Sequence, residues 1–215
     1  MRHPHGLRAA VGGAVAPAIT FVASAKATGN ASVTINKPTG TANNDLMIAF
    51  VFMDSGLNRT WTPPSGWTEV LDMNSPPNIT VAYKIAGASE PANYTWSPSG
   101  TGGCAGTIVT YSNASYDKIG TVSTTMVGSV QTASGITLAA SGSTLFAFFC
   151  NSNTGVTWSS PTSGLSSLVS NSTTYGSYVL YSQDNVGSGA TGDKSATVSS
   201  TSGERGYVLV GIKPS

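Results

Sequence analysis

The chain has 215 residues, a formal net charge of +1 and only 9% charged residues, against about 25% in an average soluble domain. So small a net charge excludes the broad basic surface with which proteins bind nucleic acid or anionic membranes. An apolar fraction of 40% is enough for a hydrophobic core in one large all-β domain or two small ones. Glu, Lys, Arg and Gln are scarce, which argues against long amphipathic helices.

The N-terminal residues 1–31 are expected to form an extended arm that docks on a neighbouring surface. Basic residues come first, and a weakly apolar run rich in Ala, Gly and Val follows. This order resembles a secretory signal, but Gly12, Gly13 and Pro17 interrupt the run, and it is too short to span a membrane. The basic and large apolar residues of this segment are the expected partner-binding residues: Arg2, Leu7, Arg8, Ile19 and Phe21.

From residue 32 onward, the sequence predicts short strands joined by turns of Pro, Gly, Asn and Ser, without a helical period. In the first half, alternating or continuous apolar runs predict strands over 32–36, 46–53, 67–71, 79–85, 94–96 and 104–111. A polar connection over 112–135 is expected to contain one strand, over 119–125. In the second half, the predicted strands are 145–150, 165–169, 176–181, 195–198 and 207–212.

The second half of the chain repeats the first. Three blocks match at the spacing that separates Ala49 from Ala147: 46–51 with 144–149, 62–67 with 160–165, and 81–83 with 179–181. Two pseudo-repeats, about 32–112 and 130–213, would bury their apolar faces against each other in one domain, residues 32–215. We therefore predict an all-β fold, a jelly-roll-like antiparallel β-sandwich with an N-terminal arm. An immunoglobulin-like sandwich is the second choice, because the typical Cys…Trp…Cys spacing is absent.

Residues typical of catalysis are scarce. His3 and His5 both lie in the arm, so Ser-His-Asp, Cys-His and histidine-rich metal sites are excluded from the sandwich. The nine acidic residues lie mostly at strand ends and in turns, which does not suggest the opposed pair that a glycosidase needs. Neither a calcium loop nor a phosphate-binding loop is present. We predict that the chain is not an enzyme and that it holds no cofactor or metal.

The cysteines and tryptophans allow two interpretations each. Cys104 and Cys150 lie in apolar strands, which favours two buried thiols over the alternative of one disulfide. Trp67 matches Leu165 in the second repeat and is expected in the core. The alternative is that Trp61, Trp67, Trp96 and Trp158, with several tyrosines, form a platform on which a sugar stacks. Trp61 precedes a Pro-Pro turn and is the tryptophan expected to be exposed, where it could contact a partner.

Four stretches of the first repeat carry a resemblance to a known family: 45–51, 64–70, 81–91 and 94–96. They resemble a recurring β-sandwich module of tailed-bacteriophage virion proteins, which include capsid decoration (cement) proteins and tail-fibre or baseplate parts, and of some bacterial surface proteins. The resemblance covers roughly residues 32–213. Its more specific strings are Pro64-Ser65-Gly66-Trp67 and, over 86–91, AGASEP. The second repeat departs from both, with Leu165 in place of the Trp and no AGASEP string over 182–189.

The resemblance implies a structural protein without catalytic residues. The expected function is capsid decoration on the virion surface, with the major capsid protein and neighbouring copies of the chain, in a dimer or trimer, as partners. The alternative is a carbohydrate- or receptor-binding module of a tail fibre or bacterial surface protein, for which a glycan would be the ligand. Neither nucleic acid nor a membrane is an expected partner.

Overall fold

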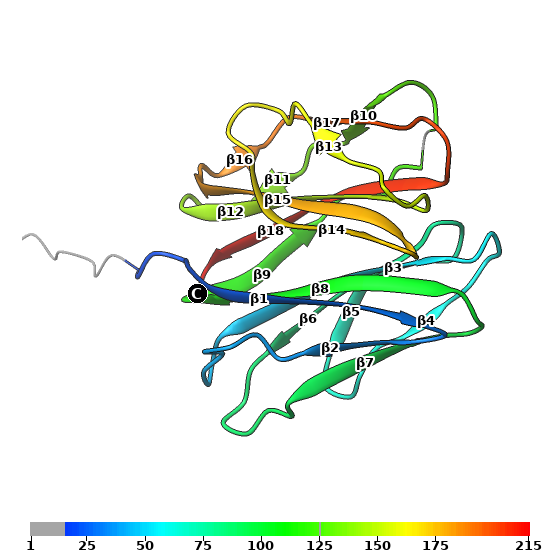
Figure 1. Ribbon diagram of the computed structural model, residues 1–215. Coiled ribbons are helices and arrows are strands. Elements are labelled where there is room, and N and C mark those ends of the chain that lie inside the picture. Colours follow the sequence, from blue (N-terminus) through cyan, green and yellow to red (C-terminus); the bar gives the residue numbers. More distant parts are fainter. Residues whose placement is uncertain (1–15, 125) are drawn as a thin grey trace, which may run out of the picture.

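The computed structural model describes residues 16–124 and 126–215, which form an all-β fold of antiparallel sheets (Figure 1). Within these residues 18 strands are present and no helix, which confirms the predicted fold class. The strands group into two halves of the same topology, one in the lower and one in the upper part of Figure 1.

The first repeat contains a five-stranded and a three-stranded sheet. The larger sheet has the order β1-β8-β3-β6-β5, with β1 (Thr20–Asn30), β8 (Gly103–Ser112), β3 (Leu46–Asp54), β6 (Asn78–Ile85) and β5 (Thr68–Met73). The smaller sheet has the order β2-β7-β4, with β2 (Val33–Asn36), β7 (Asn93–Pro98) and β4 (Trp61–Thr62).

The second repeat has the same two sheets in the same order. Its larger sheet, read from the opposite edge, is β9 (Ala114–Ile119), β18 (Arg205–Pro214), β12 (Ser143–Asn151), β15 (Gly176–Val186) and β14 (Ser166–Thr173). Its smaller sheet is β10 (Val130–Ala133), β17 (Lys194–Val198) and β13 (Trp158–Ser159). A two-stranded sheet, β11 (Thr137–Leu138) with β16 (Gly189–Ala190), is added. Each strand of the first repeat thus has a counterpart with equivalent neighbours, as the internal repeat predicts.

The sheets form four layers, with the two five-stranded sheets face to face in the middle (Figure 1). Between them lies a central core to which both repeats contribute, and in which the rings of Phe50 and Phe148 stack with centroids 5.4 Å apart. Each smaller sheet covers the outer face of its own five-stranded sheet over a separate core. Strands β3 and β12 are therefore buried on both faces, which explains their uninterrupted apolar sequence.

Two edge strands differ from the prediction. The sequence places residues 20–30 in the arm, whereas they form β1, which pairs with β8 from Thr20↔Ser112 to Asn30↔Gly103. The sequence also predicts a strand over 119–125, whereas β9 ends at Ile119. Within residues 120–124, only Ser123 forms a β-bridge, to Tyr207. Both strands open a repeat at a sheet edge, where half-exposed small and polar residues give a weak apolar period. The repeats therefore begin with β1 and β9 rather than at residues 32 and 130.

One of the three matched sequence blocks is displaced by a residue. Ala49 pairs with Ala82, and its counterpart Ala147 pairs with Tyr181, so Ala82 and Tyr181 are equivalent. The sequence match instead aligns Tyr83 with Tyr181. These two tyrosines lie on opposite faces, since Tyr83 packs against the central core and Tyr181 belongs to an outer core. A shift of one residue along a strand exchanges its faces, so the structural register is the correct one.

The two cysteines are free thiols. Cys104 is buried in the outer core of the first repeat and Cys150 in the central core. The prediction of two buried thiols is confirmed, and the disulfide alternative is wrong. Burial raises the pKa of the Cys104 thiol to about 12, so it stays protonated at neutral pH.

Candidate functional site

The structure separates the residues that the sequence predicts to bind a partner. Arg2, Leu7 and Arg8 lie outside the described residues. Ile19 and Phe21 lie at the N-terminal end of β1, whereas Trp61 belongs to β4 in the smaller sheet of the first repeat (Figure 1). The three described residues of this set therefore do not form one site.

Trp61 is buried, so the prediction of an exposed Trp61 is wrong. Its exposed fraction is 4%, and it belongs to the outer core of the first repeat. The indole Nε1–H donates a hydrogen bond to the carbonyl oxygen of Asn78 at 3.2 Å, and the backbone N–H donates to Oδ2 of Asp72 at 3.3 Å. Pairing of Trp61 with Pro98 in the small sheet holds the residue in place with its indole in the core.

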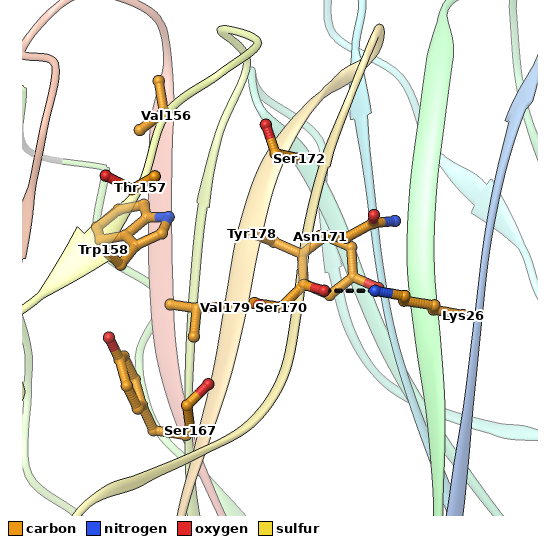
Figure 2. Close-up of a pocket in the computed structure, with 11 residues that line it drawn as sticks. Lys26, Val156, Thr157, Trp158, Ser167, Ser170, Asn171, Ser172, Tyr178 and Val179 are labelled. Atoms are coloured by element: carbon orange, nitrogen blue, oxygen red, sulfur yellow. Dashed lines mark hydrogen bonds between the residues drawn. The ribbon is translucent and has the colours of Figure 1, made fainter.

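The counterpart of Trp61 lines an open groove. Trp158 begins β13, and its partly exposed indole packs against Phe149 with centroids 5.3 Å apart. The groove has a volume of about 490 Å³ and is lined by Trp158 and by residues of β14 and β15, with Lys26 of β1 at its other end (Figure 2). Val179 and Tyr181 of β15 form its floor, and Ser167 and Ser170 of β14 form the wall opposite the indole. We refer to this site as the Trp158 groove.

Two carboxylates occupy the equivalent place in the first repeat. Glu69 pairs with Ala82 as Ser167 pairs with Tyr181, so Glu69 and Ser167 are counterparts. By the same register, Asp72 is the counterpart of Ser170, and a β-bulge follows Glu69 and Ser167 alike. Glu69 accepts a hydrogen bond from Oγ1 of Thr80 at 2.7 Å, and Asp72 accepts the one from Trp61. The carboxylates of the first repeat are thus held by hydrogen bonds, whereas serines stand at the equivalent positions beside the groove.

The carboxylates of the first repeat do not form an opposed catalytic pair. Burial raises the pKa of Glu69, and the charge of Asp72 raises it further, although the hydrogen bond from Thr80 lowers it. Burial also raises the pKa of Asp72. Both residues project from the same strand, β5, whereas a glycosidase places its two carboxylates across a cleft. They act here as hydrogen-bond acceptors for β6 and β4.

A second pair of acidic residues comes from different repeats. Burial raises the pKa of Glu204, and the charge of Asp54 raises it further. Burial alone raises the pKa of Asp54. Neither residue lines the Trp158 groove or the hollow described next.

The N-terminal pole of the molecule carries an apolar hollow. Residues 16–19 line a volume of about 550 Å³ together with Gly142, Thr144 and Pro214. Nδ2 of Asn113 donates to the carbonyl oxygen of Ala18 at 3.1 Å, which fastens this segment to the body. Next to it, Phe21 is 42% exposed and makes an edge-to-face contact with Tyr111. The first described residues and the end of β18 therefore meet at one pole (Figure 1).

The AGASEP string forms a turn closed by Glu90. Its carboxylate accepts hydrogen bonds from the Gly87 N–H at 2.7 Å, the Lys84 Nζ at 2.6 Å and the Tyr94 hydroxyl at 2.7 Å. Burial by itself would raise the pKa of Glu90, but these three donors and the charge of Lys84 lower it. The string thus has a structural role in the β6–β7 connection.

Residues 16–124 and 126–215 carry no cluster of metal ligands. Among them, no three His, Cys, Asp or Glu side chains lie close enough together to hold a metal ion. The same residues contain no helix with the length and apolar character needed to cross a membrane.

Comparison of the chain with protein-family models, with curated proteins and with solved structures found no match. The site is therefore defined by its own geometry. The sequence counts Trp158 among the tryptophans that could stack on a sugar, but it does not predict the groove and favours Trp61 as the exposed residue. A signal linking the two positions is present, since Trp61 and Trp158 stand at nearly the same spacing as Ala49 and Ala147.

Proposed function

We propose that the chain is a structural protein of the tailed-phage virion, of the decoration type, that attaches to the capsid surface and reinforces the shell. The observation that supports this best is the N-terminal pole. There Ile19 leads into β1, Phe21 is 42% exposed, and an apolar hollow adjoins both ends of the described chain. An exposed aromatic residue beside an apolar hollow suits attachment to a neighbouring subunit.

The body of the molecule suits the same role. Three stacked cores make it a compact block, and a surface with few charges favours dry, shape-matched contacts. The resemblance of 45–51, 64–70 and 81–91 to virion modules adds to this proposal.

The test compares the thermal stability of phage capsids with and without the protein. We expect bound protein to raise the temperature at which the shell opens. Removal of residues 1–19 should abolish binding to particles, while the circular-dichroism spectrum stays unchanged because β1 begins at Thr20. Trp61→Phe serves as a control that changes the buried indole far from the pole and should still bind. Capsids that gain no stability, or equal binding by the truncated chain, would contradict the proposal.

The second candidate is a carbohydrate- or receptor-binding module. The Trp158 groove is the specific observation that favours it, because an open aromatic groove has no part in the attachment described above.

A further inference from the structure

We propose that the Trp158 groove binds a saccharide, with the apolar C–H face of a pyranose ring on the indole and the sugar hydroxyls on Ser167 and Ser170. This site does not depend on capsid attachment, since it lies on the second repeat at β13–β15, away from the N-terminal pole (Figures 1 and 2).

The lining of the groove has the two kinds of surface that a sugar requires. A pyranose presents an apolar face of C–H groups and a rim of hydroxyls, so its site needs an aromatic face and groups that both donate and accept hydrogen bonds. Trp158 supplies the aromatic surface, and the largely buried Tyr181 also lines the groove. Ser167 and Ser170 are exposed, and neither hydroxyl is hydrogen-bonded to another described residue. A hydroxyl is both a donor and an acceptor, so each can match a sugar OH of either orientation.

The first repeat shows that the fold does not require serines at these positions. With the same strands and the same bulge, it has Glu69 and Asp72 there, which bond to Thr80 and Trp61. The second repeat has serines at both positions. This exchange leaves the indole of Trp158 partly exposed beside free hydroxyls, at the expense of two hydrogen bonds that the first repeat makes. Binding of a ligand would explain why the Trp158 indole stays partly exposed, whereas packing within the protein would favour covering it.

An extended peptide is the alternative ligand for this site, and a contact from the first repeat argues against it. Strand β14 is a sheet edge, to which a peptide could add as a further strand. However, Nζ of Lys26 on β1 donates to the carbonyl oxygen of Ser170 at 2.7 Å, in the middle of that edge (Figure 2). A lysine at an edge obstructs strand pairing. The edge is thereby protected, while the Trp158 side of β14 stays open.

The experiment uses an array of immobilised neutral and acidic glycans, probed with the full chain. We expect retention of at least one glycan, whose affinity is then measured by isothermal titration calorimetry. The double variant Ser167→Glu/Ser170→Asp copies the first repeat into the groove and should weaken that binding at least tenfold. Trp158→Ala should weaken glycan binding to the same extent. Because the indole packs on Phe149, the thermal unfolding of this variant must be compared with that of the wild type.

Ser166→Glu is the matched control. Ser166 is exposed and precedes Ser167 on β14, so its side chain points to the opposite face and the same charge is added outside the groove. Binding should be unchanged in this variant. The proposal is overturned if the wild type retains no glycan, or if the folded double variant binds as tightly as the wild type. It is also overturned if a β-strand peptide, rather than a glycan, binds and the double variant loses it. Capsid binding, measured separately, should be the same in all these variants.

Discussion

At the residue scale, pairs of equivalent positions show how a single side chain changes its task between the repeats. Trp61 and Trp158 occupy the same place, yet only Trp61 is enclosed and hydrogen-bonded through its indole N–H. The neighbouring strands differ as well, since the carboxylates of β5 are replaced by serines in β14. No property of the tryptophan itself, nor of the prolines that follow Trp61, predicts which indole is exposed.

Glu90 provides a prediction at this scale. Its side chain is 4% exposed and accepts three hydrogen bonds, so Glu90→Gln should lower the free energy of unfolding by about 2 kcal/mol at pH 7. The folded-state pKa of Glu90 is lowered, so its stabilisation is present above the unfolded pKa of about 4.3 and is lost as the pH falls through the folded pKa. Urea unfolding of both proteins from pH 7 to pH 3 should show the difference shrinking at acid pH.

Glu204→Gln is the control, because the pKa of Glu204 is shifted in the direction opposite to that of Glu90. Burial and Asp54 raise the pKa of Glu204, so the folded state disfavours its charge. Removal of that charge should leave the stability at pH 7 unchanged or higher. Equal losses in the two variants would show that the Glu90 hydrogen bonds are not the cause.

At the scale of elements, the strands that the sequence predicts best are those buried on both faces. β3 and β12 stand out as continuous apolar runs, and their match reveals the repeat. β1 and β9 are edge strands with small or polar exposed residues, so their sequences resemble an arm and a linker. The Trp158 groove was not predicted because it depends on the register of β14 against β15, including a bulge that the sequence does not mark.

The role of β1 can be tested by truncation. Removal of residues 1–30 should lower the midpoint of thermal unfolding and promote aggregation, because it exposes the edge of β8 and uncovers the outer core beside Ala25 and Ala27. Removal of residues 1–19 should leave the midpoint unchanged within a few degrees. Differential scanning calorimetry and light scattering measure both effects. Equal stability of the two truncated proteins would mean that β1 contributes nothing to the sheet.

At the scale of the whole molecule, the repeats meet as the subunits of a symmetric dimer do. Strand β15 of the second repeat contacts β8 of the first, where the Tyr178 hydroxyl donates to the carbonyl oxygen of Gly106 at 3.0 Å. The reciprocal pair is β6 with β18, where Ile79 lies against Gly206. Equivalent pairs of strands thus meet twice with the roles of the repeats exchanged, as in an isologous interface.

This arrangement predicts a single unfolding unit. Urea unfolding of the full chain, followed by tryptophan fluorescence and by circular dichroism, should give one coincident transition, because the central core belongs to both repeats. Residues 20–112 expressed alone would expose Phe50 and Phe52 of that core. We expect this fragment to dimerise or aggregate, which sedimentation velocity can detect. Two separate transitions, or a monomeric stable fragment, would show that the outer cores suffice.

The meeting of the first and last described residues at one pole has a practical consequence for display and purification. Ala16 and Pro214 border the same hollow, so a domain fused directly to Ala16 or to the end of β18 would crowd the same end of the molecule. Cargo attached there would compete with whatever docks beside Phe21. Insertions in the turns of the opposite pole, such as that at Gly56, would leave this end unobstructed.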